Sequence, residues 1–369
     1  MKIAFVVHDY HRGGGHSRYV VELAERFGGE HEVHVFANTF SPDESTIAGF
    51  HHLPAWRRTA LTTILTFLPA TRFIGRGFDI IHTQGLCSLQ ANVITSHICT
   101  RAWFNARKRT EKELPLKDYI FEAAISPLEK RFYSKLSRRV IAVSHKVRKD
   151  LATFYGRSIN VDVIHHGIDL NRFSPSNRPV WRAAMRSHFG FRDSDFVFLF
   201  VGDLRKGAPV AIEALASVPE GRLLLVSHTV PGLYAEIARR AGVYDRVLFS
   251  PALASIEQVY AACDAFVFPT PYDAFGMVIA EAMASGLPVI TTREAGAAEW
   301  IANEVSGILV ENPTDARELA GHMSRLSRSP ENCHIFAEGG RRAVEPHGWD
   351  SVAHETMRIY ETVLSSGKR

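Results

Sequence analysis

Short apolar runs of strand length alternate with helix-like segments along this chain, and this alternation constrains the fold more than any other feature. It begins with a run at 2–7, a glycine-containing loop and an amphipathic stretch at 17–27. Further strand-like runs lie at 31–38, 78–85, 92–97 and 138–144. Strands that alternate with helices favour a parallel sheet with helices on both faces.

The pattern stops in the loop-like segment 163–179, where Pro175 and Pro179 lie close together, and then it restarts. The strand-like runs of the second half are 196–202, 222–228, 246–251, 265–269, 287–292 and 307–311. A chain of 369 residues also exceeds what one hydrophobic core usually holds. We therefore expect an α/β fold with two Rossmann-like domains, 1–170 and 171–346, that face each other across a ligand-binding cleft.

Composition narrows the class of protein. An apolar fraction of 46% and a charged fraction of 22% are ordinary for a soluble globular protein. The four cysteines have no CxxC spacing, so neither a zinc site nor a disulfide framework is expected. The first apolar run is too short for a signal peptide, and no stretch approaches the roughly 18–20 apolar residues of a membrane span. These features predict a cytoplasmic protein.

Positive charge is concentrated in the segment 57–109. It holds eight basic residues and one acid, Asp79; the basic residues are Arg57, Arg58, Arg72, Arg76, Arg101, Arg107, Lys108 and Arg109. Residues 56–76 mix apolar side chains with arginines, which suits a surface helix resting on anionic lipid at the inner face of the cytoplasmic membrane. The alternative is a basic helix that covers the core. No recognised nucleic-acid module accompanies the basic residues, so a nucleic-acid partner is not expected.

Two acids flank a glycine turn in the stretch PYDAFGMVIAEAMASGLPVI, which follows the strand-like run 265–269. Backbone N–H groups at the start of a helix near Gly276 would form an anion site. Glu281, one turn into that helix, could accept hydrogen bonds from the two hydroxyls of a ribose, while Asp273 would meet whatever lies beyond the phosphates. The alternative is that each acid only stabilises the helix dipole.

Two further loops have residues that are suited to binding phosphate. Arg205 and Lys206 lie in GDLRKGAP, after the strand-like run 196–202, where a guanidinium and an ammonium could neutralise a diphosphate. The run Gly13–Gly15 lets the backbone approach a ligand closely. It is not a G-x-G-x-x-G fingerprint, and no acid ends the next strand, so dinucleotide binding is disfavoured. An oxidoreductase is the guess that the N-terminal strand, glycine loop and helix alone would suggest, and failure to bind a reduced nicotinamide cofactor would dismiss it.

Together these motifs resemble the family-4 retaining glycosyltransferases of GT-B fold. The resemblance rests on the D-x7-E block with FG inside it, the RKG loop, the segment HHGIDLNRFSP and the glycine loop near residue 14. The ending, HGWDSVAHETMRIYETVL, looks like the helix that crosses back to the N-terminal domain, which gives a third segment, 347–369. The short RKG loop looks most like the lipopolysaccharide-core glucosyltransferase branch.

The resemblance implies a role for each matching residue. Glu281 would hold the donor ribose, Arg205 and Lys206 would stabilise the diphosphate, and Asp273 would contact the sugar where the family normally has Glu. His97 would lie near the reacting sugar, although a histidine at a strand end is also a common structural hydrogen-bonding group. The remaining donor-binding residues are Gly14 and Gly15 from the other domain, with Phe275, Gly276, Met277 and Val278 at the turn.

The implied reaction moves a hexose from a UDP-, GDP- or ADP-sugar to a glycan, lipid-linked or small-molecule acceptor. The acceptor attacks on the face that the diphosphate leaves, which retains the configuration, and neither a metal nor a cofactor is required because the cations and the helix end supply positive charge. Two alternatives remain open. A sugar-nucleotide 2-epimerase shares the architecture, and a non-catalytic protein could bind the nucleotide sugar.

Overall fold

The computed structural model describes residues 1–41, 49–75, 77–111 and 113–366. Arg76 of the basic segment lies outside the described residues. Residue contacts divide the chain into two compact units, Met1–Gly167 with Trp349–Arg369, and Ile168–Gly348. The division falls within three residues of the two domain boundaries proposed from the sequence.

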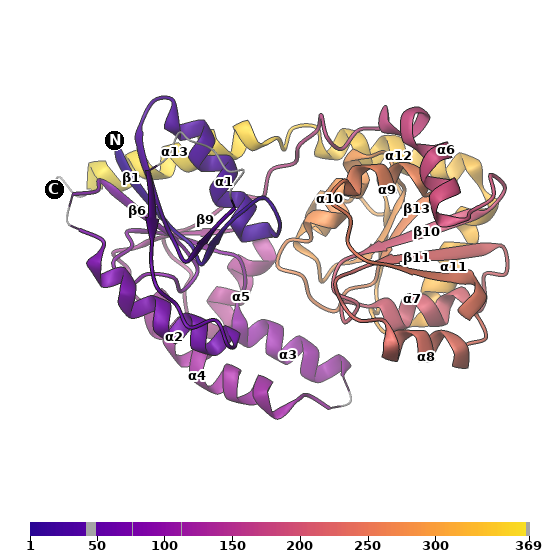
Figure 1. Cartoon of the computed structure of the whole chain (residues 1–369), viewed down its shortest axis with the longest axis horizontal. Helices are drawn as coiled ribbons and strands as arrows, with labels where there is room; N and C mark the ends of the chain where they lie inside the picture. Colours follow the sequence, from indigo (N-terminus) through magenta and orange to yellow (C-terminus); the bar gives the residue numbers. More distant parts are fainter. Residues whose placement is uncertain (42–48, 76, 112, 367–369) are drawn as a thin grey trace. The chain divides into compact units, whose positions relative to one another are not determined.

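The first unit is built on a parallel sheet of seven strands in the order β5-β3-β1-β6-β7-β8-β9 (Figure 1). These strands are β1 (Lys2–Val6), β3 (Glu32–Ala37), β5 (Gly49–His52), β6 (Ile80–Gln84), β7 (Val93–Ser96), β8 (Arg139–Ala142) and β9 (Val161–Val163). A separate two-stranded pair joins β2 (Asp9–Tyr10) to β4 (Thr39–Phe40). Every pairing is parallel, as the strand–helix alternation predicts.

Helices connect these strands, and the C-terminal helix joins them. The helices of the unit are α1 (Gly15–Gly28), α2 (Ala60–Ala70), the 3-10 turn Thr71–Phe73, α3 (Thr100–Thr110), α4 (Leu116–Tyr133), α5 (His145–Tyr155) and α13 (Trp349–Ser366). The Tyr360 hydroxyl of α13 lies 2.7 Å from His82 Nδ1 of β6, and Asp350 lies 2.6 Å from Arg26 Nε of α1. The end of the chain therefore belongs to the first unit, as the resemblance implies.

The second unit holds a parallel sheet of six strands in the order β12-β11-β10-β13-β14-β15 (Figure 1). Its strands are β10 (Phe196–Val201), β11 (Gly221–Val226), β12 (Val247–Ser250), β13 (Ala265–Phe268), β14 (Val289–Thr292) and β15 (Ile308–Val310). Its helices are α6 (Asn177–Phe189), α7 (Ala208–Leu215), α8 (Gly232–Arg240), α9 (Ile256–Ala262), α10 (Met277–Ala284), α11 (Ala316–Arg328) and α12 (Pro330–Val344), with 3-10 turns at Tyr244–Arg246 and Gly296–Trp300.

One expectation about the linker is wrong. The segment 163–179 reads as loop in the sequence because of its prolines, but α6 begins at Asn177. Pro179 is the third residue of this helix. Proline is tolerated there because the first N–H groups of a helix have no acceptor within it.

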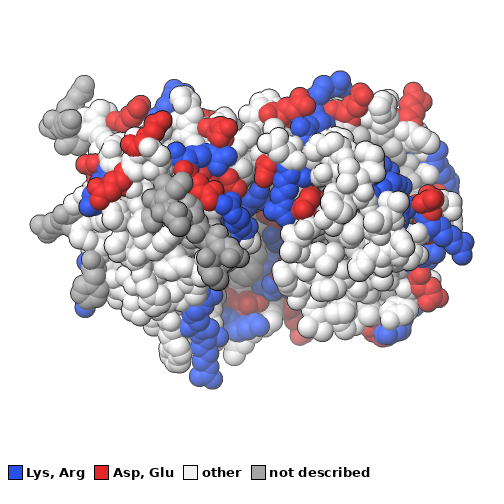
Figure 2. Space-filling model, turned by 45° about the horizontal axis from the view of Figure 1, so that its top comes forward, with Lys and Arg blue, Asp and Glu red and all other residues white. Residues whose placement is uncertain are grey.

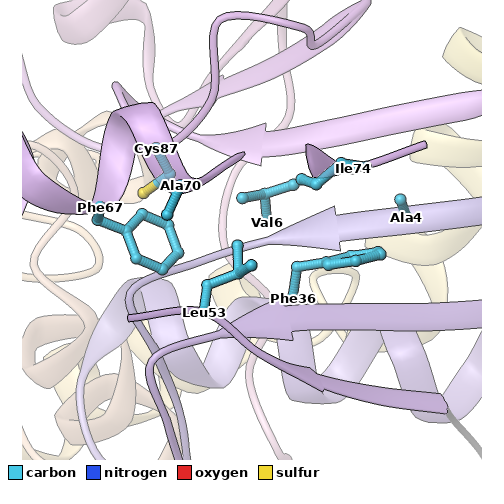
Figure 3. Close-up of a cluster of buried hydrophobic side chains, with 8 residues drawn as sticks. All are labelled: Ala4, Val6, Phe36, Leu53, Phe67, Ala70, Ile74 and Cys87. Carbon is cyan, nitrogen blue, oxygen red and sulfur yellow. The ribbon is translucent and has the colours of Figure 1, made fainter. Parts of the chain in front are cut away.

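Helix α2 contributes to the core of the first unit. Figure 3 shows the Phe67 ring of α2 in a buried cluster that reaches across β1 and β3. The cluster comprises Ala4, Val6, Phe36, Leu53, Phe67, Ala70, Ile74 and Cys87. Arg57, just before the helix, forms an ion pair with Asp9. These contacts support the alternative in which the basic segment covers the core.

Charge is mixed over the face of the molecule shown in Figure 2, where lysine and arginine side chains lie among aspartates and glutamates. This mixing agrees with a formal net charge of only +4. Among the described helices, none combines the length and the apolarity that crossing a membrane would require.

Candidate functional site

The predicted phosphate-binding residues gather where two neighbouring strands of the second sheet end. Strand β10 pairs directly with β13, although β11 and β12 intervene in the sequence. The chain thus reverses its direction of strand addition between β10 and β13. Loops that follow the two strands on either side of such a reversal form the usual ligand site of an open α/β sheet.

A glycine allows the loop after β10 to pack closely against the loop after β13. Gly207 ends the loop after β10 with a φ of 107°, in the left-handed region that favours glycine. A Cβ added to Gly207 would lie 2.3 Å from the carbonyl oxygen of Pro269, which follows β13. Only glycine therefore allows this close approach of the two loops.

Lys206 and Asp273 meet across these loops. Lys206 Nζ lies 2.7 Å from Asp273 Oδ2, and the Asp273 side chain is only 13% exposed. Asp273 is further fixed by its backbone, whose N–H donates to the Glu294 carbonyl at 2.9 Å. The structure thus brings a predicted diphosphate-binding cation and the predicted sugar-binding acid into contact.

Arg205 is held by an acid that was not predicted from the sequence. Its Nε lies 3.1 and 3.0 Å from the two carboxylate oxygens of Asp203, and its backbone N–H donates to Oδ1 at 3.0 Å. Burial alone would raise the pKa of the Asp203 carboxyl, but the hydrogen bonds and charge of Arg205, together with the charge of Lys206, hold that pKa below its ordinary value. Asp203 is therefore ionised and fixes one edge of the guanidinium.

The glycine turn opens helix α10 without a side-chain cap. Gly276 is the N-cap residue, with a φ of 88° in the left-handed region, and it offers no side-chain oxygen to the first turn. The N–H groups at the start of a helix have no acceptor within the helix, so those of Gly276, Met277 and Val278 are suited to an anion. Phe275 precedes this turn, and its N–H donates to Asp273 Oδ1 at 3.3 Å.

Glu281 lies one turn into α10 and is buried. The Tyr260 hydroxyl of α9 lies 3.2 Å from Glu281 Oε2 and 3.2 Å from the Val278 carbonyl oxygen. Burial, together with the Glu281 carboxylate, raises the pKa of Tyr260 well above its ordinary value. The phenol therefore stays protonated and donates to these acceptors. Tyr260 was not predicted from the sequence.

A cavity of about 340 Å³ adjoins the loop that carries Arg205 and Lys206. It lies at the carboxyl ends of β11 and β12 and includes Leu204 of that loop among its lining residues. The others on its wall include Ser227, His228, Thr229, Phe249 and Ser250. A planar, mainly apolar group with a few polar edges would fit such a wall.

The remaining predicted residues belong to the first unit. Gly14 is the N-cap residue of α1, with a φ of 91°, and Gly15 begins the helix. His97 follows β7, and its ring is held on both sides. Its Nε2 lies 2.8 Å from Gln84 Oε1, and its Nδ1 lies 3.3 Å from His166 Nε2.

These partners define the state of His97. Because Gln84 Oε1 only accepts, Nε2 of His97 carries the proton and Nδ1 is the acceptor. Burial, followed by the neighbouring His166, holds the pKa of His97 well below its ordinary value, so the ring is neutral. This arrangement supports a structural hydrogen-bonding role, and the catalytic role of His97 stays a prediction. Gln84 and His166 were not predicted from the sequence.

Two family models match the chain. The model described as Glycosyltransferase Family 4 matches residues 13–172, and the one described as Glycosyl transferases group 1 matches residues 195–329.

Several curated relatives of the chain have the same description. The D-inositol 3-phosphate glycosyltransferase of Segniliparus rotundus is 31% identical over 63% of this chain and 54% of the relative. The protein of the same description from Thermomonospora curvata is 25% identical over 93% of this chain and 84% of the relative. The chain spans little more than half the length of the first curated relatives that it matches.

Solved structures share the fold. WaaG, a glycosyltransferase involved in lipopolysaccharide biosynthesis, matches with a TM-score of 0.81 at 20% identity, over 97% of this chain and 99% of WaaG. Anabaena HepE, solved in complex with UDP and glucose, matches with a TM-score of 0.75 at 19% identity, over 98% of this chain and 100% of HepE. At these identities the likeness shows a common two-domain α/β fold.

Proposed function

Because the chain belongs to the family-4 glycosyltransferases of GT-B fold, we propose that it transfers a hexose from a nucleotide-diphosphate sugar to an acceptor. One observation carries the proposal. Lys206 and Asp273 meet at 2.7 Å, on loops that follow neighbouring strands, where helix α10 also begins. Positive charge, uncapped N–H groups and a carboxylate thus lie together, as a diphosphate joined to a sugar requires.

In this proposal the donor lies along the second unit. Its diphosphate contacts Arg205, Lys206 and the backbone amides at 276–278, and Glu281 receives the ribose hydroxyls. The base occupies the cavity of about 340 Å³ next to the Arg205 loop. A UDP-, GDP- or ADP-sugar would fit this scheme, and the UDP bound by HepE, which has the same fold, supports the choice of a nucleotide.

The proposed reaction retains the configuration of the sugar. The acceptor attacks from the face that the diphosphate leaves, and a diphosphate oxygen takes the acceptor's proton. Arg205, Lys206 and the start of α10 stabilise the negative charge that develops on the leaving group. Asp273 contacts the sugar and orients it.

We further propose that the acceptor is a glycan, a lipid-linked glycan or a small molecule that meets the first unit, where Gly14, Gly15 and His97 lie. The proposed location is cytoplasmic, at the inner face of the cytoplasmic membrane, where a lipid-linked acceptor would be presented. Nucleic acid is not among the proposed partners.

Incubation with UDP-, GDP- and ADP-glucose and a panel of acceptors tests the proposal. Release of nucleoside diphosphate that depends on the acceptor, with a product of unchanged anomeric configuration by NMR, is expected. Conversion of the donor sugar without any acceptor would instead identify a 2-epimerase. Tight binding of the donor without turnover would identify a binding protein.

Metal independence is a separate expectation. Two cations and a helix end already supply positive charge at the proposed diphosphate position, so chelation by EDTA should leave the transfer rate within about twofold of the untreated rate. Adding Mg²⁺ or Mn²⁺ back should change little. A rate that falls with EDTA and recovers with Mg²⁺ would contradict this part of the proposal.

Replacing Tyr260 by Phe should weaken donor binding moderately. The change removes the hydroxyl that donates to Glu281 and to the Val278 carbonyl, and it leaves the ring in place, so a loss of about 3- to 10-fold in donor affinity is expected, the equivalent of about 1 kcal/mol. Titration calorimetry with nucleoside diphosphate and with free diphosphate separates the effects. Only the nucleoside form should bind more weakly, because only it has a ribose.

A further inference from the structure

One side of helix α4 directs apolar side chains away from the protein, while Ile125, Phe132 and Tyr133 on the other side are buried. Leu116 is 74% exposed, Ile120 is 52% exposed and Tyr119 is 42% exposed. Ala123 and Pro127 continue the same side of the helix and are also exposed. Spacings of three and four residues place these side chains on one face. A surface helix of a globular protein normally does the reverse and directs this face toward the core.

The acids of α4 are on the opposite side. Asp118 forms an ion pair with Arg107 of α3 at 2.8 Å, and Glu122 forms one with Arg101 of α3 at 2.8 Å. The third acid, Glu129, is buried, and burial raises the pKa of its carboxyl.

Glu129 also has fixed partners. It accepts hydrogen bonds from the Thr100 N–H at 3.1 Å, the Thr100 hydroxyl at 2.9 Å and the Tyr155 hydroxyl at 2.6 Å. All three acids of the helix are therefore used in packing α3, α4 and α5 together. Figure 1 shows α3 and α4 side by side.

The charges on the outer face of α4 are positive. Lys117, Lys130 and Arg131 are all exposed, and Lys108 and Arg109 at the end of α3 are exposed as well. Basic residues beside an exposed apolar face are typical of helices that lie on an anionic membrane surface. A protein partner or a second copy would not require this segregation of acids from bases.

A groove beside this face suits a phosphate headgroup. It has a volume of about 450 Å³ and lies between α3, α4 and α5, with Arg101 and Lys130 among its lining residues. Ser126 also lines it and is 2% exposed, and within the described part of the chain its hydroxyl has no hydrogen-bond partner. Pro127 and Phe154 add apolar surface. A lipid phosphate in this groove would lie beside Lys130 and Arg101.

We propose that the outer face of α4 docks on an anionic phospholipid bilayer, with Leu116 and Ile120 among the lipids and the neighbouring cations on headgroups. This inference assigns the contact to α4 instead of α2, whose Phe67 is committed to the core. It extends the proposed function by locating the membrane contact, but it does not require transferase activity. A lipid-linked acceptor would reach the enzyme at the same surface.

Co-sedimentation with vesicles tests the inference. Wild-type protein should bind vesicles of phosphatidylcholine with phosphatidylglycerol at low salt, bind them less at high salt, and not bind pure phosphatidylcholine. The pairs Leu116→Ser/Ile120→Ser and Lys117→Glu/Arg131→Glu should each lower the affinity at least about tenfold. Leu233→Ser and Arg239→Glu/Arg240→Glu change exposed residues of α8, the second with the same change of charge, and these controls should bind as wild type.

Three outcomes would overturn the inference. The first is the absence of binding to anionic vesicles by folded wild-type protein, and the second is an equal loss of binding in the α8 controls. The third is a concentration-dependent dimer that the α4 variants disrupt, because the apolar face would then meet a second copy.

Transfer to a water-soluble acceptor in the absence of vesicles separates this inference from the proposed function. The α4 variants should keep the wild-type rate, which also shows that they fold. Vesicle binding by a protein that transfers no sugar would refute only the proposed function.

Discussion

Alanine at both Arg205 and Lys206 is expected to lower the rate of sugar transfer by at least about 10³-fold, because removal of one preorganised donor to a developing negative charge commonly costs 10²–10³-fold. Both cations lie on the loop after β10, and Lys206 extends to the loop after β13. Without them only the start of α10 would stabilise the leaving diphosphate. The measurement is kcat/KM for the donor that the wild-type enzyme prefers.

The adjacent pair Arg239 and Arg240 provides the matched control. It lies on α8 of the same unit and is exposed, and its replacement by two alanines removes the same charge. This control should keep wild-type transfer, and the melting temperatures of the two double variants should be similar. Wild-type activity in the variant lacking Arg205 and Lys206 would refute their role at the diphosphate.

Asn at position 273 is expected to lower kcat by about 10- to 100-fold and to leave the affinity for nucleoside diphosphate unchanged or higher, since one charge-assisted contact to the reacting sugar is lost. The amide oxygen of Asn can still accept from the Phe275 N–H, so the turn before α10 should survive. Loss of the carboxylate also leaves Lys206 with less negative charge beside it, which favours a bound anion.

Steady-state kinetics and calorimetry together test this expectation for Asp273. Asp273→Glu is the companion variant, because it keeps the charge and restores the acid that the resemblance leads one to expect here. It should retain more activity than Asp273→Asn. A variant with unchanged kcat and weaker binding of nucleoside diphosphate would show instead that Asp273 acts on the nucleotide.

The parallel sheets could be predicted from sequence because buried parallel strands are short continuous apolar runs. The predicted runs at 196–202 and 265–269 are each one residue longer than the strands β10 and β13 that they contain.

Helix α4 could not be predicted from the pattern of apolar residues. Its outer face is as apolar as its inner face, its three acids lie inward, and Pro127 interrupts its sequence. A pattern search that expects polar residues outside therefore finds no helical period there.

The candidate site was predictable in its residues but not in its contacts. Lys206 and Asp273 are 67 positions apart, and they meet only because β13 inserts beside β10. Asp203 could have been suspected as an acid two residues before an arginine in a turn. Tyr260 gave no such signal, because a tyrosine in an amphipathic helix is usually a core residue.

The central claim is that the donor diphosphate lies between the cations at 205–206 and the backbone amides at 276–278. A crystal structure with a bound nucleotide-diphosphate sugar tests it most directly. The prediction is that diphosphate oxygens lie within about 3.2 Å of Lys206 Nζ and of the Met277 backbone nitrogen. A diphosphate bound elsewhere on the chain, out of reach of both groups, would contradict it.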